Sequence, residues 1–381
     1  MMHLLGGRVL LADGSQAETS VHLDAGRIVA LDAPDRSGTT IDASGLVILP
    51  GIVDLHGDAF ERQLQPRPGV DFPAPLALRD TQAQLLANGI TTAFHAITLS
   101  WEPGLRSPDT WRRILDALAG LGPAMICDMR VHMRWEMHNL PALEMALADI
   151  EAGRVGLVGF NDHTPSILRK LATPSGAAKY SERAGMDVAA FRALAEAAAS
   201  HAADVPAATA RLAEAASRRH LPMASHDDDT TAARDRFRAL GADICEFPMT
   251  EAVGLAARAA GDAVVMGCPN VVRGGSHLGW ASAASLAERD ICTVLCSDYY
   301  YPAMLAAAWS LAGRIGLARA WALISANPAA AAGLTDRGAI APGRRADLVL
   351  VDPAGPSVVV TLAAGKLAHV DGAQWHARTV T

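Results

Sequence analysis

A histidine and an aspartate stand two residues apart, directly after an apolar run, in the stretch GIVDLHGDAFERQLQPRPGVDFP that begins at Gly51. They are His56 and Asp58. Alternate residues of a strand share one side, so the two side chains can hold a single ion if the apolar run is a strand. Imidazole and carboxylate ligands suit Zn²⁺, Mn²⁺ or Fe²⁺. The pair therefore indicates a metal centre that needs further ligands.

Similar residues follow other apolar runs: Glu136 ends MRVHMRWE, His163 follows VGLVGFND, His226 ends LPMASH, and Asp298 follows CTVLCS. Singly, each has a plainer explanation. One histidine after a strand is usually a hydrogen-bonding loop residue, as His95 can be, and an aspartate can cap a helix. Recurrence at several strand ends is harder to explain in this way, because buried carboxylates are costly unless paired or metal-bound. We predict that these four residues join the first pair in one site.

The elements that carry these residues alternate between strand-like and helix-like over residues 47–344, and the Ala-rich segment near residues 189–216 predicts one helix. Eight strand candidates are GIVDLH, ITTAFHAI, MRVHMRWE, VGLVGFND, LPMASHD, DICEFPMT, AVVMGCPN and CTVLCSDYY. Eight such units predict an α/β fold, a (β/α)8 TIM barrel, in which function lies at the carboxyl ends of the strands. A doubly wound sheet is the alternative, but no GxGxxG follows the first strand.

Both ends of the chain differ from the middle. Residues 1–46 and 345–381 read as short strands with tight turns, such as the turn at Ala25-Gly26. Neither end has enough strands to be stable alone. We therefore predict one small β-sandwich domain formed by both termini, with the barrel between them, over the alternative of two unrelated hairpins.

Composition narrows the function. The chain has 381 residues, is 50% hydrophobic and carries a formal charge of -7, which is typical of a globular protein and does not favour nucleic acid or an anionic membrane as a partner. No apolar run is long enough to span a bilayer, and the first residues do not resemble a signal peptide. The five cysteines form no C-x-x-C pair, so we expect reduced thiols and a cytoplasmic location. The sequence is compatible with a homo-oligomer.

The ligand pattern resembles that of the amidohydrolase superfamily. VILPGIVDLHGD is similar to that superfamily's entry into the barrel, and NPAAAAGLTDRGAIAPGRRADLVLVD to its exit. The resemblance implies two divalent ions, with Zn²⁺ the first choice and Mn²⁺ or Fe²⁺ as alternatives. No lysine lies at a mid-barrel strand end, so Glu136 is the candidate bridging ligand. The implied division is His56, Asp58 and Asp298 for one ion, and His163 and His226 for the other; Asp298 and Glu136 are the catalytic candidates.

A narrower resemblance rests on DLHGDAFERQLQPRPGVDFP, RVHMRWE, NDHTP, SHDDDT, CEFPMT, PNVVRGGSHLGW and LCSDYYYPAML. Together and in this order they resemble the diphosphatase family of the carbon–phosphorus lyase pathway. The resemblance implies a role in phosphonate metabolism. The implied substrate is a small phosphorylated sugar, alpha-D-ribose 1-methylphosphonate 5-triphosphate, which would lose diphosphate by attack of water on the α-phosphorus.

Several cations near the ligand segments agree with a phosphorylated substrate, because arginine binds phosphate oxygens in a bidentate fork. Two glycines in RGGSH let backbone amides approach an anion. The predicted substrate-binding residues are Arg62, Arg67, Arg273 and His277. Surface ion pairs and a merely flexible loop are the alternatives, and Arg134, on the same side of its strand as Glu136, can pack inside the barrel.

Two other functions stay open. An amide hydrolase or deaminase acting on a cyclic or acetylated substrate would use the same metal chemistry on carbon, because the metal site alone does not select the reacting atom. A binding module with a structural metal is less favoured, because structural sites are usually closed and rich in cysteine.

Overall fold

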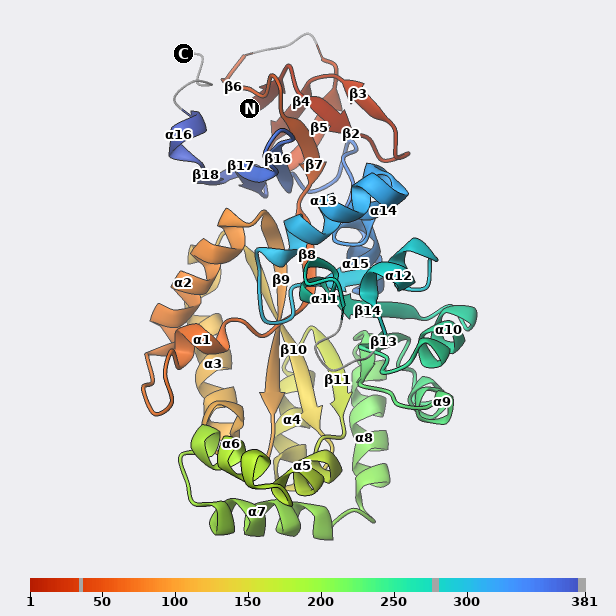
Figure 1. Ribbon diagram of the computed structural model, residues 1–381. Helices are drawn as coiled ribbons and strands as arrows, with labels where there is room; N and C mark the ends of the chain where they lie inside the picture. The colour runs from red at the N-terminus through yellow and green to blue at the C-terminus, as the bar shows by residue number, and fades with distance from the viewer. Residues whose placement is uncertain (34–36, 276–280, 376–381) are drawn as a thin grey trace.

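The computed structural model describes residues 1–33, 37–275 and 281–375, and its centre is a sheet of eight parallel strands paired in chain order (Figure 1). These strands coincide with the eight predicted segments, and the predicted TIM barrel is confirmed. They are β8 (Ile52–Gly57), β9 (Ile90–Leu99), β10 (Asp128–Glu136), β11 (Leu157–Asn161), β12 (Met223–His226), β13 (Ile244–Glu246), β14 (Ala263–Gly267) and β15 (Val294–Cys296).

The sheet closes at the carboxyl ends of its first and last strands. The Asp298 backbone N–H donates to the His56 carbonyl, and the Asp58 N–H donates to the Asp298 carbonyl, each over 2.9 Å. The Asp54 carboxylate accepts hydrogen bonds from the backbone N–H (2.9 Å) and hydroxyl (2.6 Å) of Ser297. Closure therefore takes place at the level of the predicted metal ligands.

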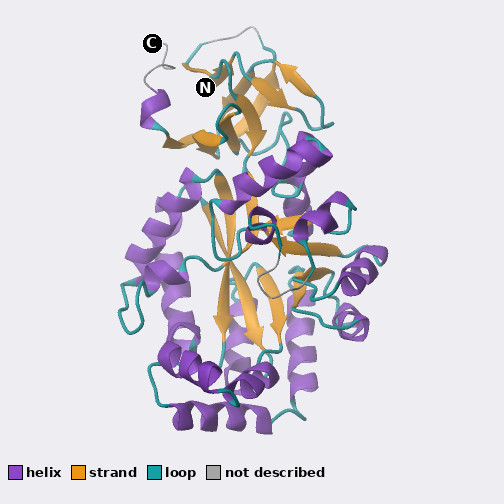
Figure 2. Cartoon of the chain, viewed as in Figure 1, coloured by secondary structure: helices purple, strands orange, loops and turns teal. Residues whose placement is uncertain are grey.

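Helices cover the outside of the barrel (Figure 2). They are α2 (Ala74–Ala87), α3 (Pro108–Leu121), α4 (Leu143–Glu151), α8 (Val205–Arg218), α9 (Thr231–Ala239), α10 (Glu251–Ala259), α11 (Cys268–Val272), α12 (Ala283–Glu288), α13 (Ala303–Ile315), α14 (Leu317–Ala322) and α15 (Ala326–Ala331); the short helix α1 (Glu61–Leu64) follows the first strand in the chain and contacts α2. Helix α3 shows why they form. The Ser107 side chain caps its N-terminus by accepting from the Thr110 N–H. Trp111, Ile114 and Leu115 recur at helical spacing and are buried against the barrel.

One group of helices is inserted between β11 and β12: α5 (Thr164–Leu171), α6 (Pro174–Ala184) and α7 (Val188–Ser200). Figure 1 shows them at the end of the barrel to which β9 and β10 point. The Ala-rich stretch near residues 189–216 was predicted as one helix, and this was wrong. Helix α7 ends before α8 begins at Val205, with Pro206 in the first turn of α8. Proline removes a backbone donor and so begins the second helix rather than continuing the first.

The two ends of the chain form two further sheets (Figure 1). One contains β1 (Met2–Leu5), β4 (Val21–Asp24), β5 (Arg27–Leu31) and β6 (Thr39–Asp42); the other contains β2 (Arg8–Leu10), β3 (Gln16–Glu18), β7 (Val47–Pro50), β16 (Leu348–Asp352), β17 (Ser357–Ala363) and β18 (Lys366–Val370). Helix α16 (Gly372–Trp375) follows. Leu4, Ile41, Leu348 and Val360 share one core between the sheets, which confirms a β-sandwich built from both termini.

The join between sandwich and barrel differs slightly from the expected one. Strand β7 pairs with β16 and β2, so the sheet region continues to Pro50 and past residue 46. Its partner β16 begins at Leu348, shortly after the expected position of 345. Among the described residues, no helix is both long and apolar enough to cross a membrane.

Arg337 ties the segment between barrel and sandwich to the strand starts. Its guanidinium Nη1 donates to Thr92 Oγ1 on β9 over 2.8 Å and to the Asp128 carboxylate on β10 over 2.7 Å, and its Nε donates to Asp336 over 2.8 Å. The side chain is buried. A buried cation whose donors are all directed at protein acceptors stabilises this end of the barrel.

Replacing Arg337 by methionine tests that stabilisation. We expect Arg337→Met to lower the free energy of unfolding by about 1.5–3 kcal/mol, because charged hydrogen bonds are lost from a buried site. Urea unfolding followed by circular dichroism measures it. The control is Arg112→Met, whose partner Asp109 is 88% exposed and which should change the free energy by less than about 0.5 kcal/mol. Equal midpoints for wild type and Arg337→Met would contradict this role.

Candidate metal centre

Three barrel strands are followed by a residue in the left-handed backbone conformation. These are Asp227 after β12 (φ 61°), Phe247 after β13 (φ 52°) and Asp298 after β15 (φ 54°). Aspartate tolerates this region, whereas a bulky residue such as phenylalanine rarely adopts it. Such strain clusters at functional sites, where it aims side chains. In this protein the left-handed conformation turns the chain sharply at the carboxyl ends of these three strands.

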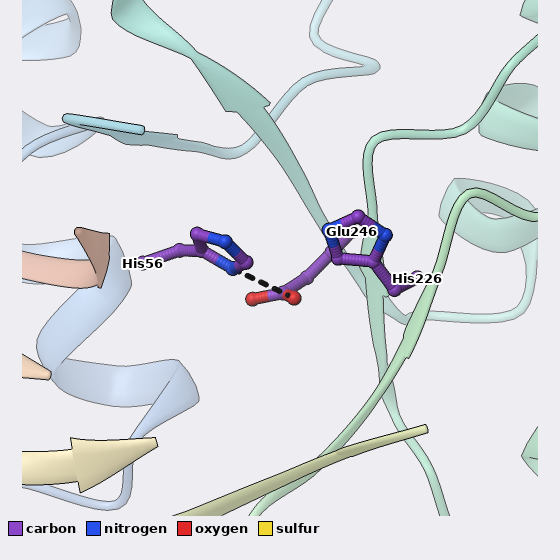
Figure 3. Close-up of side chains that lie close together, drawn as sticks. All are labelled: His56, His226 and Glu246. Carbon is purple, nitrogen blue, oxygen red and sulfur yellow. Dashed lines mark hydrogen bonds and ion pairs between the residues drawn. The ribbon is translucent and has the colours of Figure 1, made fainter. Parts of the chain in front are cut away.

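One set of possible ligands consists of His56, His226 and Glu246, whose donor atoms lie within 4.8 Å of one another (Figure 3). Glu246 ends β13 and is fully buried. One of its oxygens, Oε2, lies 3.0 Å from Nδ1 of His56, and the other, Oε1, lies 3.8 Å from Nδ1 of His132. Glu246 can therefore either bind an ion directly or fix the ring of His56 so that its other nitrogen faces the ion.

A second set consists of His163, His226 and Asp227, again within 4.8 Å. The Asp227 carboxylate lies 3.6 Å from Nε2 of His163 and 3.2 Å from Nδ1 of His226. Because His226 belongs to both sets, it connects them. The donors in both sets are imidazoles and carboxylates, which is the chemistry that Zn²⁺, Mn²⁺ and Fe²⁺ accept, so the residues present fit a divalent ion.

The electrostatics of the histidines favour the ligand form. Burial lowers the pKa of His56 well below its usual value, and the positive charge of Arg134 adds to the effect. Burial also lowers the pKa of His226. Burial of Asp227 opposes its ionisation, but attraction to His226 and His163 outweighs burial and lowers its pKa. The lowered pKa values of His56 and His226 favour neutral imidazoles, which is the form that binds a metal ion.

Glu136 lies beside the second set but belongs to neither. Its carboxylate accepts hydrogen bonds from the Thr164 hydroxyl (2.7 Å) and from the backbone N–H groups of His163 and Thr164 (3.2 Å each), at the start of α5. Its Oε2 is 3.6 Å from Nδ1 of His163. Glu136 therefore positions His163 in this structure, and its role as a bridging ligand stays a prediction.

Asp58 and Asp298 line the same cavity as His56 and His226. Burial, with Asp58 nearby, raises the pKa of Asp298 to about 8. Asp58 Oδ2 lies 3.5 Å from Nη1 of Arg134. Neither aspartate belongs to the two compact sets. The structure thus brings all six predicted ligands to one end of the barrel, four of them into one cavity.

The cavity also contains cations. Arg134, from β10, and Arg273, after α11, line it together with Tyr299 and Asn270. Arg273 Nη1 donates to the Tyr299 hydroxyl over 3.4 Å. Arg62 and Arg67 are exposed and do not line this cavity, and His277 lies outside the described residues. Contact of these three with substrate stays a prediction.

Three residues of the site were missed as ligands or ligand partners: Glu246, Asp227 and Arg134. Glu246 ends the sixth strand, so the same strand-end rule that selected Glu136 could have found it. His95, which was left open, lies within β9 at the edge of the Phe60 ring and away from the cavity.

Comparison with known proteins agrees with the fold. The sequence model of the Amidohydrolase family matches residues 47–375, and the chain belongs to that family. Over 350 residues, 90% of this chain and 93% of the other, it is 32% identical to the alpha-D-ribose 1-methylphosphonate 5-triphosphate diphosphatase of Escherichia coli (strain K12). Members of the family generally use divalent metal ions.

Solved structures share the architecture at low identity. The N-acetylglucosamine-6-phosphate deacetylase of Pasteurella multocida superimposes with a TM-score of 0.65 at 11% identity, covering 97% of this chain and 100% of the other. The 5-methylcytosine deaminase of Klebsiella pneumoniae gives 0.61 at 16% identity, covering 97% and 98%. These likenesses establish the fold and leave the reaction open.

Removal of His226 tests the centre, because this residue belongs to both ligand sets. We expect His226→Ala to lower the affinity for divalent metal by more than about tenfold. Inductively coupled plasma mass spectrometry on dialysed protein measures the bound ions and their number. The matched control is His95→Leu, a buried histidine with no ring hydrogen bond to described residues, which should keep its metal. A His226→Ala protein with wild-type metal content would refute the assignment.

Glu246 gives a second prediction. Glu246→Gln keeps the size of the side chain but removes its charge, so His56 loses a charged partner. We expect a roughly 10- to 100-fold weaker metal affinity with an unchanged circular dichroism spectrum. Competition with a chromogenic chelator measures the affinity. An unchanged affinity would place Glu246 outside the metal centre.

Proposed function

We propose that the protein is a metal-dependent diphosphatase that releases diphosphate from a ribose 5-triphosphate. Its proposed natural substrate is alpha-D-ribose 1-methylphosphonate 5-triphosphate. The observation that carries this is the 32% identity, over nearly the whole of both chains, to the Escherichia coli enzyme of that name. The proposal places the protein in phosphonate metabolism in the cytoplasm, where its five buried free thiols stay reduced.

The charges of the cavity support an anionic substrate. Arg134 and Arg273 line it beside the candidate ligands. Guanidinium groups bind phosphate oxygens through paired N–H donors and remain charged at any physiological pH. A neutral amide or a nucleobase would not need two such cations. The cavity is therefore better matched to a polyphosphate than to the substrate of an amide hydrolase or deaminase.

We propose that divalent ions, Zn²⁺ first among them, bind at the centre. Two ions would divide the ligands as His56, Asp58 and Asp298 on one side and His163 and His226 on the other, with Glu136 between them. A bound divalent ion lowers the pKa of water towards neutrality and polarises a phosphoryl oxygen. Glu246 and Asp227 would hold the histidine rings in place.

The remaining groups would act on the substrate and the attacking water. Water attacks the α-phosphorus, the bond from that phosphorus to the bridging oxygen of the β-phosphate breaks, and diphosphate leaves while the 5-phosphate stays on the sugar. Asp298, which lies at the closure of the barrel and lines the cavity, would accept the proton of the water in its ionised form. Arg273 offsets the negative charge that the leaving diphosphate carries.

Phosphorus NMR of the reaction tests the proposal directly. Metal-loaded protein mixed with alpha-D-ribose 1-methylphosphonate 5-triphosphate should give the resonance of diphosphate and that of a sugar 5-phosphate. Release of orthophosphate instead would indicate attack at the terminal phosphorus. Absence of any phosphorus product, with turnover of an N-acetylated sugar or a cytosine derivative, would replace the diphosphatase by the alternative functions.

Arg273 provides a quantitative prediction. Arg273→Met should lower kcat/KM for the triphosphate roughly ten- to a hundred-fold, because one charge-assisted contact to phosphate is lost. The control is Arg289→Met, an exposed arginine paired with Glu251 at 2.7 Å. Arg67→Ala belongs in the same series: Arg67 is exposed and does not line the cavity, and if its predicted contact with substrate forms, the substitution should lower kcat/KM with an unchanged metal content, whereas an unchanged kcat/KM would remove Arg67 from the substrate site. Equal values for Arg273→Met and Arg289→Met would remove Arg273 from the substrate site.

A further inference from the structure

Arg134 is a buried cation inside the candidate centre whose donors are only partly used. It lies on β10, and its side chain is 6% exposed. One terminal nitrogen is 3.5 Å from Asp58 Oδ2 and the other is 3.3 Å from His226 Nε2. Its buried Nε has no hydrogen-bond partner among the described residues. A guanidinium offers five donors, so most of its capacity is free for a ligand.

Arg234 is a buried arginine of the same protein with a purely structural role, and it provides a comparison for Arg134. It is fully buried beneath β12 and β13, and its Nη1 donates to the Ile244 carbonyl (3.1 Å) and to Ser225 Oγ. Its Nη2 donates to the Ala242 carbonyl, and its Nε lies 3.0 Å from Asp262. The Nε of Arg234 makes no hydrogen bond, like that of Arg134, but it is ion-paired with Asp262, and the two terminal nitrogens both donate to protein oxygens. Arg134 has only two long contacts, of 3.5 Å and 3.3 Å, and its Nε has neither a hydrogen bond nor an ion pair among the described residues, which is the pattern expected of a group that binds a substrate.

The location of Arg134 narrows what that substrate group is. Asp58 and His226 are both candidate ligands, so the guanidinium lies next to the atoms at which the reaction would take place. It lines the cavity together with Asp298 and Arg273. A permanent positive charge here would repel a cationic substrate. A neutral substrate would offer it no negatively charged group to bind. It matches an oxyanion at the reacting atom.

We propose that Arg134 binds the oxygens of the reacting phosphoryl group, while Arg273 at the rim binds the more distant phosphates. Arg134 thereby determines that this member of the family accepts a phosphorus centre rather than a neutral carbonyl. The inference rests on the proposed function for the identity of the substrate. The binding of a phosphate group by Arg134 can be measured without turnover.

The test uses inorganic phosphate as the probe, with metal-loaded protein and isothermal titration calorimetry. We expect Arg134→Ala to weaken phosphate binding at least about tenfold while its metal content, measured after the titration, equals that of wild type. Arg134→Lys keeps a charge but loses the fork, and should bind with intermediate affinity. Guanidinium ion at millimolar concentration should partly restore binding to Arg134→Ala but not to Arg273→Met.

The matched control is Arg130→Ala, four residues earlier on β10. Arg130 donates to the Asp128 carboxylate over 3.0 Å and does not line the cavity, so its loss should leave phosphate binding unchanged. Wild-type phosphate affinity in Arg134→Ala would overturn the inference. So would loss of metal or of the folded state in both Arg134 variants, since either result assigns the residue a structural role.

Turnover separates this inference from the proposed function. Phosphate binding that depends on Arg134, in a protein that does not cleave the ribose triphosphate, would leave Arg134 as a phosphate-binding residue and remove the diphosphatase. Cleavage of the triphosphate by Arg134→Ala at the wild-type kcat/KM would keep the diphosphatase and remove Arg134 from substrate binding.

Discussion

Two backbone hydrogen bonds hold Asp298 against the first barrel strand, one to the His56 carbonyl and one from the Asp58 N–H. The residues that make these bonds are also the ones whose side chains line the cavity. Closing the barrel and assembling this side of the centre are therefore the same event. Without the closure, β8 and β15 would be the two unpaired edges of an open parallel sheet, and their polar ends would lie on opposite sides of the molecule. Asp54, through Ser297, strengthens the same junction.

The centre is costly to the fold. Buried imidazoles and carboxylates are removed from water, and three strand ends adopt a left-handed backbone that Phe247 would otherwise avoid. The stabilisation comes from regions that carry no chemistry. Inside the barrel, Leu55, Phe94 and Val265 belong to one apolar core, and at the strand starts Arg337 joins two strands. A bound cation would relieve the concentration of negative charge, so metal binding and stability should be coupled.

Much of this could be read from the sequence because it depends on local rules. A strand period of two places His56 and Asp58 together, and apolar runs with helical spacers give eight parallel units. The sequence could not predict the contacts between distant strands, because these depend on how the barrel closes. The approach of Glu246 to His56 crosses the barrel interior and depends on strand stagger rather than on spacing. Which arginines line the cavity is likewise not readable from spacing: Arg134 and Arg273 do, and Arg67 does not. The break before α8 follows a local rule as well, because Pro206 begins a helix and does not continue one.

The fold itself does not select the reaction. Proteins described as a deacetylase and a deaminase share this architecture at 11% and 16% identity, so the architecture alone does not define the reaction. The choice of substrate must therefore depend on side chains that are not needed for binding the metal. In this chain the clearest such group is Arg134, because a buried, permanent cation with unused donors is expensive for an enzyme whose substrate is neutral. Its position beside Asp58 is explained if the reacting atom carries oxyanions.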